Sequence, residues 1–328
     1  MINICYLSHN RPENFGITYD YLSRIKLENK NKIRLHILST QDFDWNSKIK
    51  NDFGIEVFIE KFENKPLNYI DKINSCVNSG FEYSIKLDED CFINNHVIDF
   101  IVENIDILKD ERNLLISPVM SNNIPSCDDF IEDFIEDKEI KDKVESELIS
   151  QNMPNGLWGV DYSHLNEFTV MAKKWNKNSF YHSVKNMNTK TKGIHPLRIC
   201  YNAQILVNDY ILKNLEKFET KRDCSFYEID APYFTNSLFA IKTNVWKEIF
   251  NNSVDGYDEI ALNEYKKNSD KNVLFIKNGF AIHTMFNTVH GNKNPWGIGS
   301  EKAPQDERDF CEKILLYLKQ KNDTLYRR

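Results

Sequence analysis

Over the first 120 positions, short apolar runs typical of strands alternate with longer patterns of helical period. The predicted strands are residues 2–7, 33–38 and 55–59, and the predicted helices are residues 15–27 and 66–78. Polar residues 8–12 interrupt the first strand before its helix, and Gly80 ends the second helix. Strands that alternate with helices in this way indicate a largely parallel sheet with right-handed crossovers.

The next apolar strand leads directly into a cluster of carboxylates. Ser84 to Leu87 alternates as a strand, and Asp88, Glu89 and Asp90 follow it. Residues that leave the carboxyl end of a strand lie where open α/β sheets bind ligands, and two acids spaced in this way suit Mg²⁺ or Mn²⁺ bound to a diphosphate. The competing interpretation is a solvated loop, because the chain has 49 Asp and Glu among 328 residues.

The middle of the chain contains an acidic segment followed by a basic one. Residues 128–147 hold ten acids against three Lys, with apolar positions at helical spacing, which predicts amphipathic surface helices. Residues 168–208 hold no acid and seven Lys or Arg. This basic segment is either a solvated loop or a mobile lid that meets an anionic acceptor or a diphosphate.

The last third of the chain returns to alternating elements. The predicted strands are residues 233–241, 273–276 and 280–283, and the predicted helices are residues 245–250, 260–267 and 305–318. The dipeptide Asn278-Gly279 predicts a turn between the last two strands.

Composition excludes several classes of protein. Hydrophobic residues at 41% and aromatic residues at 12% exclude a disordered or fibrous chain, and a net charge of −7 argues against a general nucleic-acid binder. The seven Cys include no CxxC pair, which predicts reduced thiols. The amino terminus has no basic and apolar leader, and the chain has no long apolar run. These features predict a cytoplasmic protein, either free or peripheral to a membrane.

Three stretches resemble the GT-A fold nucleotide-sugar glycosyltransferases, most closely glycosyltransferase family 2. Residues 4–13, with Asn10-Arg11-Pro12, resemble the opening strand and turn of that family; residues 86–90 resemble its DxD motif, and residues 256–259 its later acidic motif. The resemblance implies an α/β, GT-A (Rossmann-like), mostly parallel sheet flanked by helices. We expect a nucleotide-sugar-binding half at residues 1–120, a helical and irregular acceptor-side insertion at 121–230, and an acceptor and metal half at 231–328.

The same resemblance implies roles for the acidic residues. Asp90 is the expected direct ligand of Mn²⁺ or Mg²⁺, and Asp88 is expected to hold the ribose, or the metal through water. His283 is the expected third metal ligand, with His290 as the alternative. Asp258 or Glu259 is the expected catalytic base, although Asp258 also suits a helix cap.

The remaining expectations concern the nucleotide sugar. Ser8 and Lys86 lie in the stretches that resemble the family and are expected to contact the donor, and Asp42 is a displaced version of its base-binding acid. Arg11 suits a phosphate, and Trp296, in a loop rich in Gly, suits the face of a sugar, while an ordinary surface loop explains it equally well.

The function expected from these features is transfer of a sugar from a nucleotide diphosphate sugar to an acceptor hydroxyl, with a slight preference for inversion. The acceptor is a glycan, a lipid-linked molecule or another hydroxyl compound, with an anionic acceptor suggested by the basic segment. The alternatives are a non-catalytic nucleotide- or carbohydrate-binding protein and a metal-dependent nucleotidyltransferase or phosphatase. Such enzymes usually have a Gly-rich phosphate loop after the first strand, and residues 8–12 contain no Gly.

Overall fold

A computed structural model describes most of the chain. The described residues are 1–8, 12–39, 55–61, 68–77, 80–93, 95–121, 127–150, 201–221, 223–228, 237–251, 258–283 and 303–325. Two compact units are distinguished, each described by itself below: Met1–Pro118 with Arg222–Asp230 and Asn236–Ala281, and Val119–Lys221 with Ala231–Thr235 and Ile282–Arg328.

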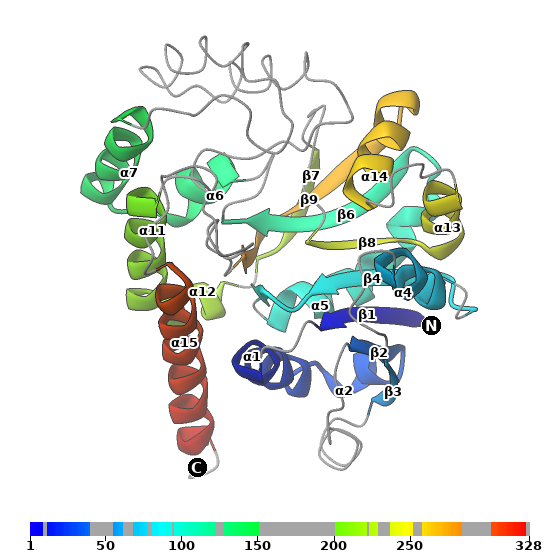
Figure 1. The fold of residues 1–328 in the computed structure, drawn as a ribbon, viewed down its shortest axis with the longest axis horizontal. Helices are drawn as coiled ribbons and strands as arrows, with labels where there is room; N and C mark the ends of the chain where they lie inside the picture. Colours follow the sequence, from blue (N-terminus) through cyan, green and yellow to red (C-terminus); the bar gives the residue numbers. More distant parts are fainter. Residues whose placement is uncertain are drawn as a thin grey trace. The chain divides into compact units, whose positions relative to one another are not determined.

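The strands form one mixed sheet (Figure 1). They are β1 (Ile2–Ser8), β2 (Ile33–Ser39), β3 (Glu56–Lys61), β4 (Tyr83–Asp88), β5 (Cys91–Ile93), β6 (Asn113–Met120), β7 (Ser225–Glu228), β8 (Leu238–Lys242) and β9 (Asn272–His283). Within the described residues the sheet has nine strands in the order β3-β2-β1-β4-β8-β6-β9-β5, and β7 pairs with β9. The predicted α/β class is therefore confirmed.

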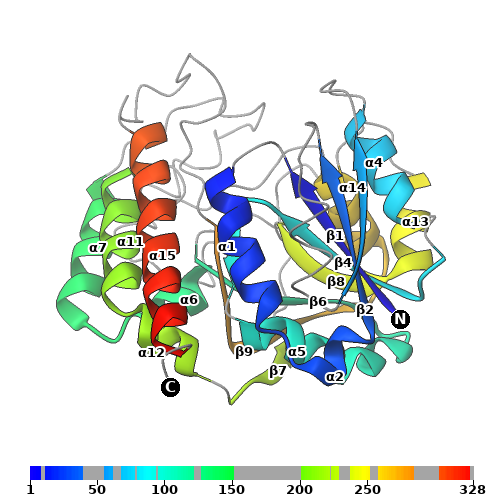
Figure 2. The same ribbon diagram turned by 90° about the horizontal axis from the view of Figure 1, so that it is seen from below.

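The helices of the first unit cover both faces of this sheet. They are α1 (Pro12–Ser23), α2 (Leu27–Lys30), α4 (Asn68–Val77), α5 (Asn95–Asn104), the 3₁₀ helix η1 (Ile105–Lys109), α13 (Thr243–Asn251) and α14 (Asp258–Asn268). Figure 2 shows α4, α13 and α14 on one face, and α1, α2 and α5 on the other. β1 lies between these two groups of helices and is shielded on both faces, which explains why it is buried at all seven positions.

The strands run parallel on one side of β4 and antiparallel on the other. β3, β2, β1 and β4 are parallel neighbours, whereas β8 pairs antiparallel with both β4 and β6. From β1 the chain moves outward to β2 and β3, and then returns to place β4 on the opposite side of β1. The strand order therefore reverses between β1 and β4.

The helix predicted at residues 15–27 is wrong at both ends. α1 begins at Pro12, because proline has no N–H to lose and its fixed φ suits the first helical turn. The helix ends at Ser23, and Ile25 N–H then donates to the Leu22 carbonyl over 3.4 Å. Lys26 is extended, with φ −54° and ψ 139°, so α2 is a separate short helix.

The turn predicted at Asn278-Gly279 is also wrong, because β9 runs unbroken from Asn272 to His283. Asn278 takes a positive φ of 61° inside the strand. A Cβ at Gly279 would lie 2.5 Å from Cγ2 of Ile276 and 3.2 Å from Cγ2 of Val97. The dipeptide therefore allows a local distortion where the continuous strand packs against α5, and it does not form a hairpin.

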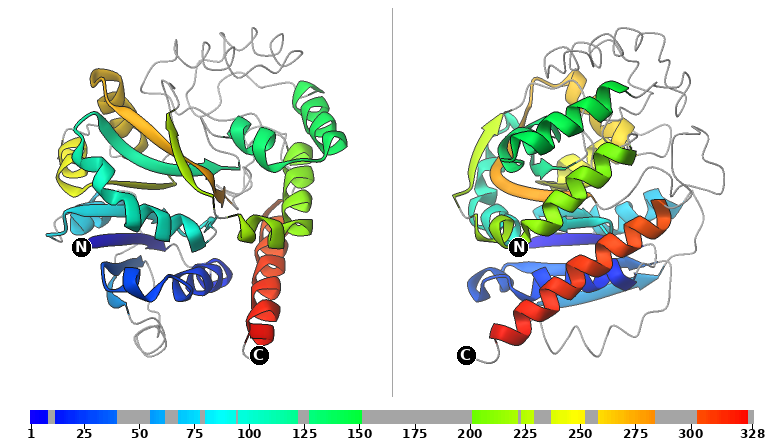
Figure 3. Two further views of the ribbon diagram at one scale, coloured as in Figure 1. Left: turned by 180° about the vertical axis from the view of Figure 1, so that it is seen from behind. Right: turned by 90° about the vertical axis from the view of Figure 1, so that its left-hand side faces the viewer.

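The second unit is built mainly from helices. They are α6 (Cys127–Phe134), α7 (Lys138–Ser150), α11 (Tyr201–Lys213), α12 (Leu215–Thr220) and α15 (Ala303–Leu325). Figure 3 shows α7, α11 and α15 running side by side. Phe130 and Phe134 stack with ring centroids 5.1 Å apart, and Phe218 meets Phe134 edge-on at 5.8 Å.

The amphipathic helices predicted for the acidic segment are confirmed as α6 and α7. Phe130 and Phe134 are buried, while Glu132 and Asp133 on the same helix are exposed. In the described part of the chain, no helix combines the length and the apolar character needed to cross a membrane.

Candidate donor-binding site

The three consecutive carboxylates lie where the strand order reverses. β4 ends at Asp88, Glu89 and Asp90 form a turn, and β5 begins at Cys91. In the parallel pairing Asp88 lies beside Leu7, one residue before the end of β1. Ligands of open α/β sheets bind outside the carboxyl ends of the strands at such a reversal. Residues 88–90, named here the acidic turn, therefore occupy the sheet edge best suited to a ligand.

Backbone hydrogen bonds hold the acidic turn from both neighbouring strands. The N–H of Asp88 donates to the carbonyl of Ser237 over 3.0 Å, and the N–H of Glu89 donates to the carbonyl of Leu7 over 3.2 Å. Ser237 directly precedes β8, and Leu7 belongs to β1. The turn is thus fixed to elements that are far apart in the sequence.

Asp88 is paired with a buried ammonium group. Lys86 Nζ donates to Asp88 Oδ1 over 2.7 Å, and the Lys86 side chain has no exposed surface. The Asp88 side chain is 26% exposed, so its carboxylate reaches solvent while the lysine beneath it does not. The two side chains share one face of β4 because they are two residues apart on a strand.

Glu89 has a separate environment from Asp88. Ser8 Oγ donates to Glu89 Oε2 over 3.2 Å, and both residues are buried. Burial, and after it the charge of Glu89, raises the pKa of the nearby Tyr6 phenol far above its ordinary value. Tyr6 therefore stays protonated. Glu89 contributes to the internal structure of the turn, whereas Asp90 is half-buried.

The acidic turn suits a cation that takes most of its ligands from elsewhere. Among the described side chains, no group of three or more His, Cys, Asp and Glu is arranged to hold a metal ion. Mg²⁺ and Mn²⁺ in nucleotide sites commonly take one or two protein carboxylates and complete their coordination with phosphate oxygens and water. Asp88 and Asp90, both partly accessible, fit that pattern.

The other residues expected in the site are only partly described. Asp258 and Glu259 form the first turn of α14, and His283 is the last residue of β9, but the positions of these three side chains are not described. Four residues considered from the sequence lie outside the described part of the chain: Arg11, Asp42, His290 and Trp296.

Two features of the site were not anticipated from the sequence. The carbonyl of Ser237 had no sequence signal, because its contact with Asp88 depends on the placement of β8 beside β4. The burial of Lys86 did have a sequence signal, because Lys86 is a charged residue in the middle of an apolar strand. Lys86 was expected to contact the donor, and in the structure its ammonium contacts Asp88.

Comparisons with known proteins give matches only among solved structures. No protein-family model matches the chain, and no curated protein matches it. GalNAc-T7, solved with UDP, GalNAc and Mn²⁺, is 12% identical and has a TM-score of 0.43, over 95% of this chain and 48% of that one.

Two bacterial proteins are similar over shorter stretches. TarS of S. aureus is 14% identical with a TM-score of 0.29, over 36% of this chain and 21% of TarS. The glycosyltransferase GlyE of Streptococcus pneumoniae is 15% identical with a TM-score of 0.26, over 36% of this chain and 30% of GlyE. The chain thus spans less than half the length of each of the three structures. All three are glycosyltransferases.

Proposed function

We propose that this protein is a metal-dependent glycosyltransferase of the GT-A type, which moves a sugar from a nucleotide diphosphate sugar to an acceptor hydroxyl. The observation that carries the proposal is the position of the acidic turn at the carboxyl end of β4, where the strand order reverses beside β1. Nucleotides bind α/β sheets at this place, and the carboxylates there suit a metal-bound diphosphate.

In this proposal Asp90 is the direct ligand of Mn²⁺ or Mg²⁺, and Asp88 holds the ribose or a metal-bound water. The cation would neutralise the negative charge that develops on the departing diphosphate. Asp88 is suited to its role because the backbone bond to Ser237 and the ion pair with Lys86 orient its carboxylate before any ligand arrives. Ser8 and Glu89 support the turn from the β1 side.

The acceptor hydroxyl must lose a proton as it attacks the anomeric carbon. We assign that proton to Asp258 or Glu259, which open α14 in the same unit as the acidic turn. Attack by the acceptor on the side opposite to the diphosphate would invert the anomeric configuration. The acceptor is a glycan, a lipid-linked molecule or another hydroxyl compound.

The decisive experiment measures nucleotide binding and donor hydrolysis together. Calorimetry with UDP and GDP should show binding that requires Mn²⁺ or Mg²⁺ and disappears with a chelator, because the carboxylates otherwise repel the phosphates. A panel of nucleotide sugars should then reveal slow hydrolysis of one donor. Asp90→Ala should abolish both binding and hydrolysis, whereas Asp106→Ala, which removes an exposed carboxylate from η1, should leave them unchanged.

Variants of the proposed base separate catalysis from binding. Asp258→Asn or Glu259→Gln should retain donor binding, and one of them should lose transfer to the acceptor. Equal nucleotide affinity with and without a cation would contradict the proposal. If the wild-type protein binds a nucleotide but neither hydrolyses nor transfers any donor, it is a nucleotide-binding protein and not a transferase.

A further inference from the structure

Lys86 is an unusual residue for the middle of a central strand. It pairs in register with Cys5 of β1 and Phe239 of β8, both of which are buried. A charged group without exposed surface is costly unless it is paired, and apolar side chains of similar volume often replace such pairs without loss of stability. The sheet itself therefore does not require a lysine at this position. The role of Lys86 depends instead on what its ammonium contacts.

One group that the ammonium contacts is the Asp88 carboxylate, 2.7 Å from Lys86 Nζ at the start of the acidic turn. The turn places three carboxylates in succession, and Lys86 is a positive charge held against the first of them. Because the ammonium is buried, water and salt screen its effect on the turn less than they would screen an exposed lysine. Its position has two consequences, one for cations and one for anions.

For a free divalent cation, the buried ammonium is unfavourable. It repels the cation, and it already satisfies one oxygen of Asp88. For a nucleotide diphosphate the same ammonium is favourable, because it reduces the repulsion between the acidic turn and the phosphates. One residue thus weakens the binding of the bare metal and strengthens the binding of the metal-nucleotide complex.

We propose that Lys86 is a positioning residue which holds Asp88 and lowers the negative charge of the acidic turn, so that the divalent cation is captured together with the nucleotide diphosphate and not alone. The inference rests on the proposed function for the nucleotide. Lys86 does not contact the donor in this scheme; it acts through Asp88.

The test is a pair of affinities measured on Lys86→Met, which keeps most of the length of the unbranched side chain and removes its charge. Free Mn²⁺ binding, followed by electron paramagnetic resonance without nucleotide, should become tighter by about threefold to tenfold. UDP binding at saturating Mn²⁺, followed by calorimetry, should become weaker by about tenfold, which corresponds to about 1.4 kcal/mol. Damage to the fold weakens both affinities, so opposite changes are specific to the proposed role.

Three further variants complete the design. Lys242→Met removes a lysine that pairs with Tyr83 at the other end of β4, and it should change neither affinity. Lys86→Arg restores the charge and should recover most of the UDP affinity. Lys86→Gln offers a second neutral side chain should methionine prevent folding, and the same opposite changes are expected.

A double-mutant cycle tests whether Lys86 acts through Asp88. In an Asp88→Asn background, Lys86→Met should weaken UDP binding far less than it does alone. The inference is overturned if Lys86→Met and Lys86→Gln weaken both affinities together, or leave both unchanged. A wild-type protein that binds Mn²⁺ but no UDP or GDP would contradict the proposed function, whereas the Mn²⁺ measurement would still decide the effect of Lys86 on the cation.

Discussion

At the scale of single residues, buried polar groups in the first unit are placed beside particular partners. His36 is 1% exposed, its Nε2 lies 3.1 Å from Glu60 Oε2, and its Nδ1 lies 3.8 Å from Cys76 Sγ. Burial lowers the pKa of His36, and this effect outweighs the opposite effect of Glu60. His36 is therefore a neutral member of the core between β2, β3 and α4.

This environment predicts a dependence of stability on pH. Because the pKa of His36 is lower in the folded than in the unfolded protein, the unfolded state binds more protons once the pH falls below about 6.5. The stability that neutral His36 supports is fully present above that pH and is lost as the pH falls. Urea unfolding at pH 7.5 and 5.5 should show a larger acid-induced loss for the wild type than for His36→Gln. Equal losses would mean that the histidine is readily protonated in the folded state.

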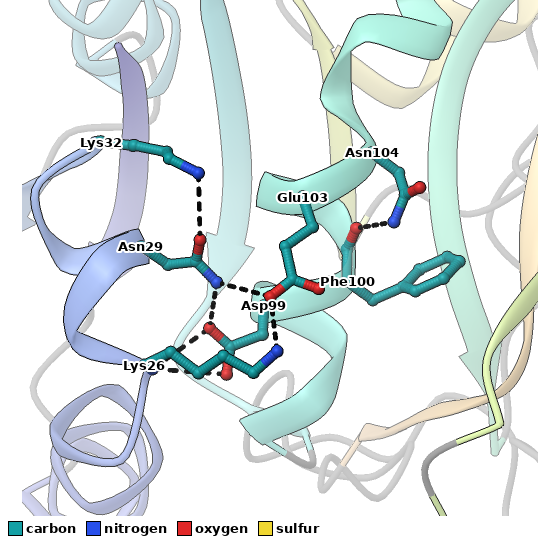
Figure 4. Close-up of polar contacts among 7 residues, drawn as sticks. All are labelled: Lys26, Asn29, Lys32, Asp99, Phe100, Glu103 and Asn104. Carbon is teal, nitrogen blue, oxygen red and sulfur yellow. Dashed lines mark hydrogen bonds and ion pairs between the residues drawn. The ribbon is translucent and has the colours of Figure 1, made fainter.

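At the scale of elements, one carboxylate fixes the short helix α2 to α5. The N–H of Lys26, just before α2, donates to Asp99 Oδ1 over 3.2 Å, and Asn29 Nδ2 donates to the same oxygen over 2.6 Å (Figure 4). Asp99 is buried, whereas Glu103, which also contacts Lys26 and Asn29, is substantially exposed. A helix of four residues cannot be stable alone, so its position depends on this contact.

The two acids of α5 should therefore differ in their effect on stability. Asp99→Ala leaves two donors without their acceptor and should lower the free energy of unfolding by about 1–3 kcal/mol. Glu103→Ala removes an exposed ion pair and should cost about 0–1 kcal/mol. Urea unfolding compares the two, and hydrogen exchange of the α2 amides locates the change. Similar losses for both variants would contradict the role given to Asp99.

At the scale of the whole molecule, the chain has two compact units. In the second unit, α15 contacts Glu219 of α12 through two residues: Lys321 forms an ion pair with this acid, and Tyr317 Oη donates to it over 3.3 Å. Glu219 is buried, and Phe310 and Ile314 of α15 are buried as well. The long helix is thus held by apolar burial together with one buried carboxylate.

Removing that carboxylate should loosen α15 first. Glu219→Ala should lower the stability of the second unit by about 1–3 kcal/mol, since hydrogen bonds to a charged group are lost. Hydrogen exchange should become faster in α15 and α12 and remain slow in β1 and β4. Glu216→Ala, which changes an exposed acid of the same helix, is the matched control. Equally faster exchange in both units would show that they unfold together.

Much of this organisation was predictable from the sequence alone. Helical and strand periods depend on which residues of a segment are apolar, so the order β1, α1, β2, β3, α4, β4 was predictable, as were the amphipathic helices α6 and α7, whereas the short elements α2 and β5 were not. The placement of Asp88 at the end of a strand was predictable for the same reason. That the site carries negative charge was predictable as well, because Asp88, Glu89 and Asp90 are all acidic.

Only the tertiary structure decided which strands are neighbours and which polar groups meet. The antiparallel placement of β8 beside β4, the contact of Asp88 with Ser237, and the unbroken course of β9 through Asn278 all depend on segments that are far apart in the chain. The pairing of Ser8 with Glu89 likewise requires β1 and β4 to be adjacent. The local pattern of apolar residues determines which element each segment can form. The contacts between segments arise only when several segments are buried together.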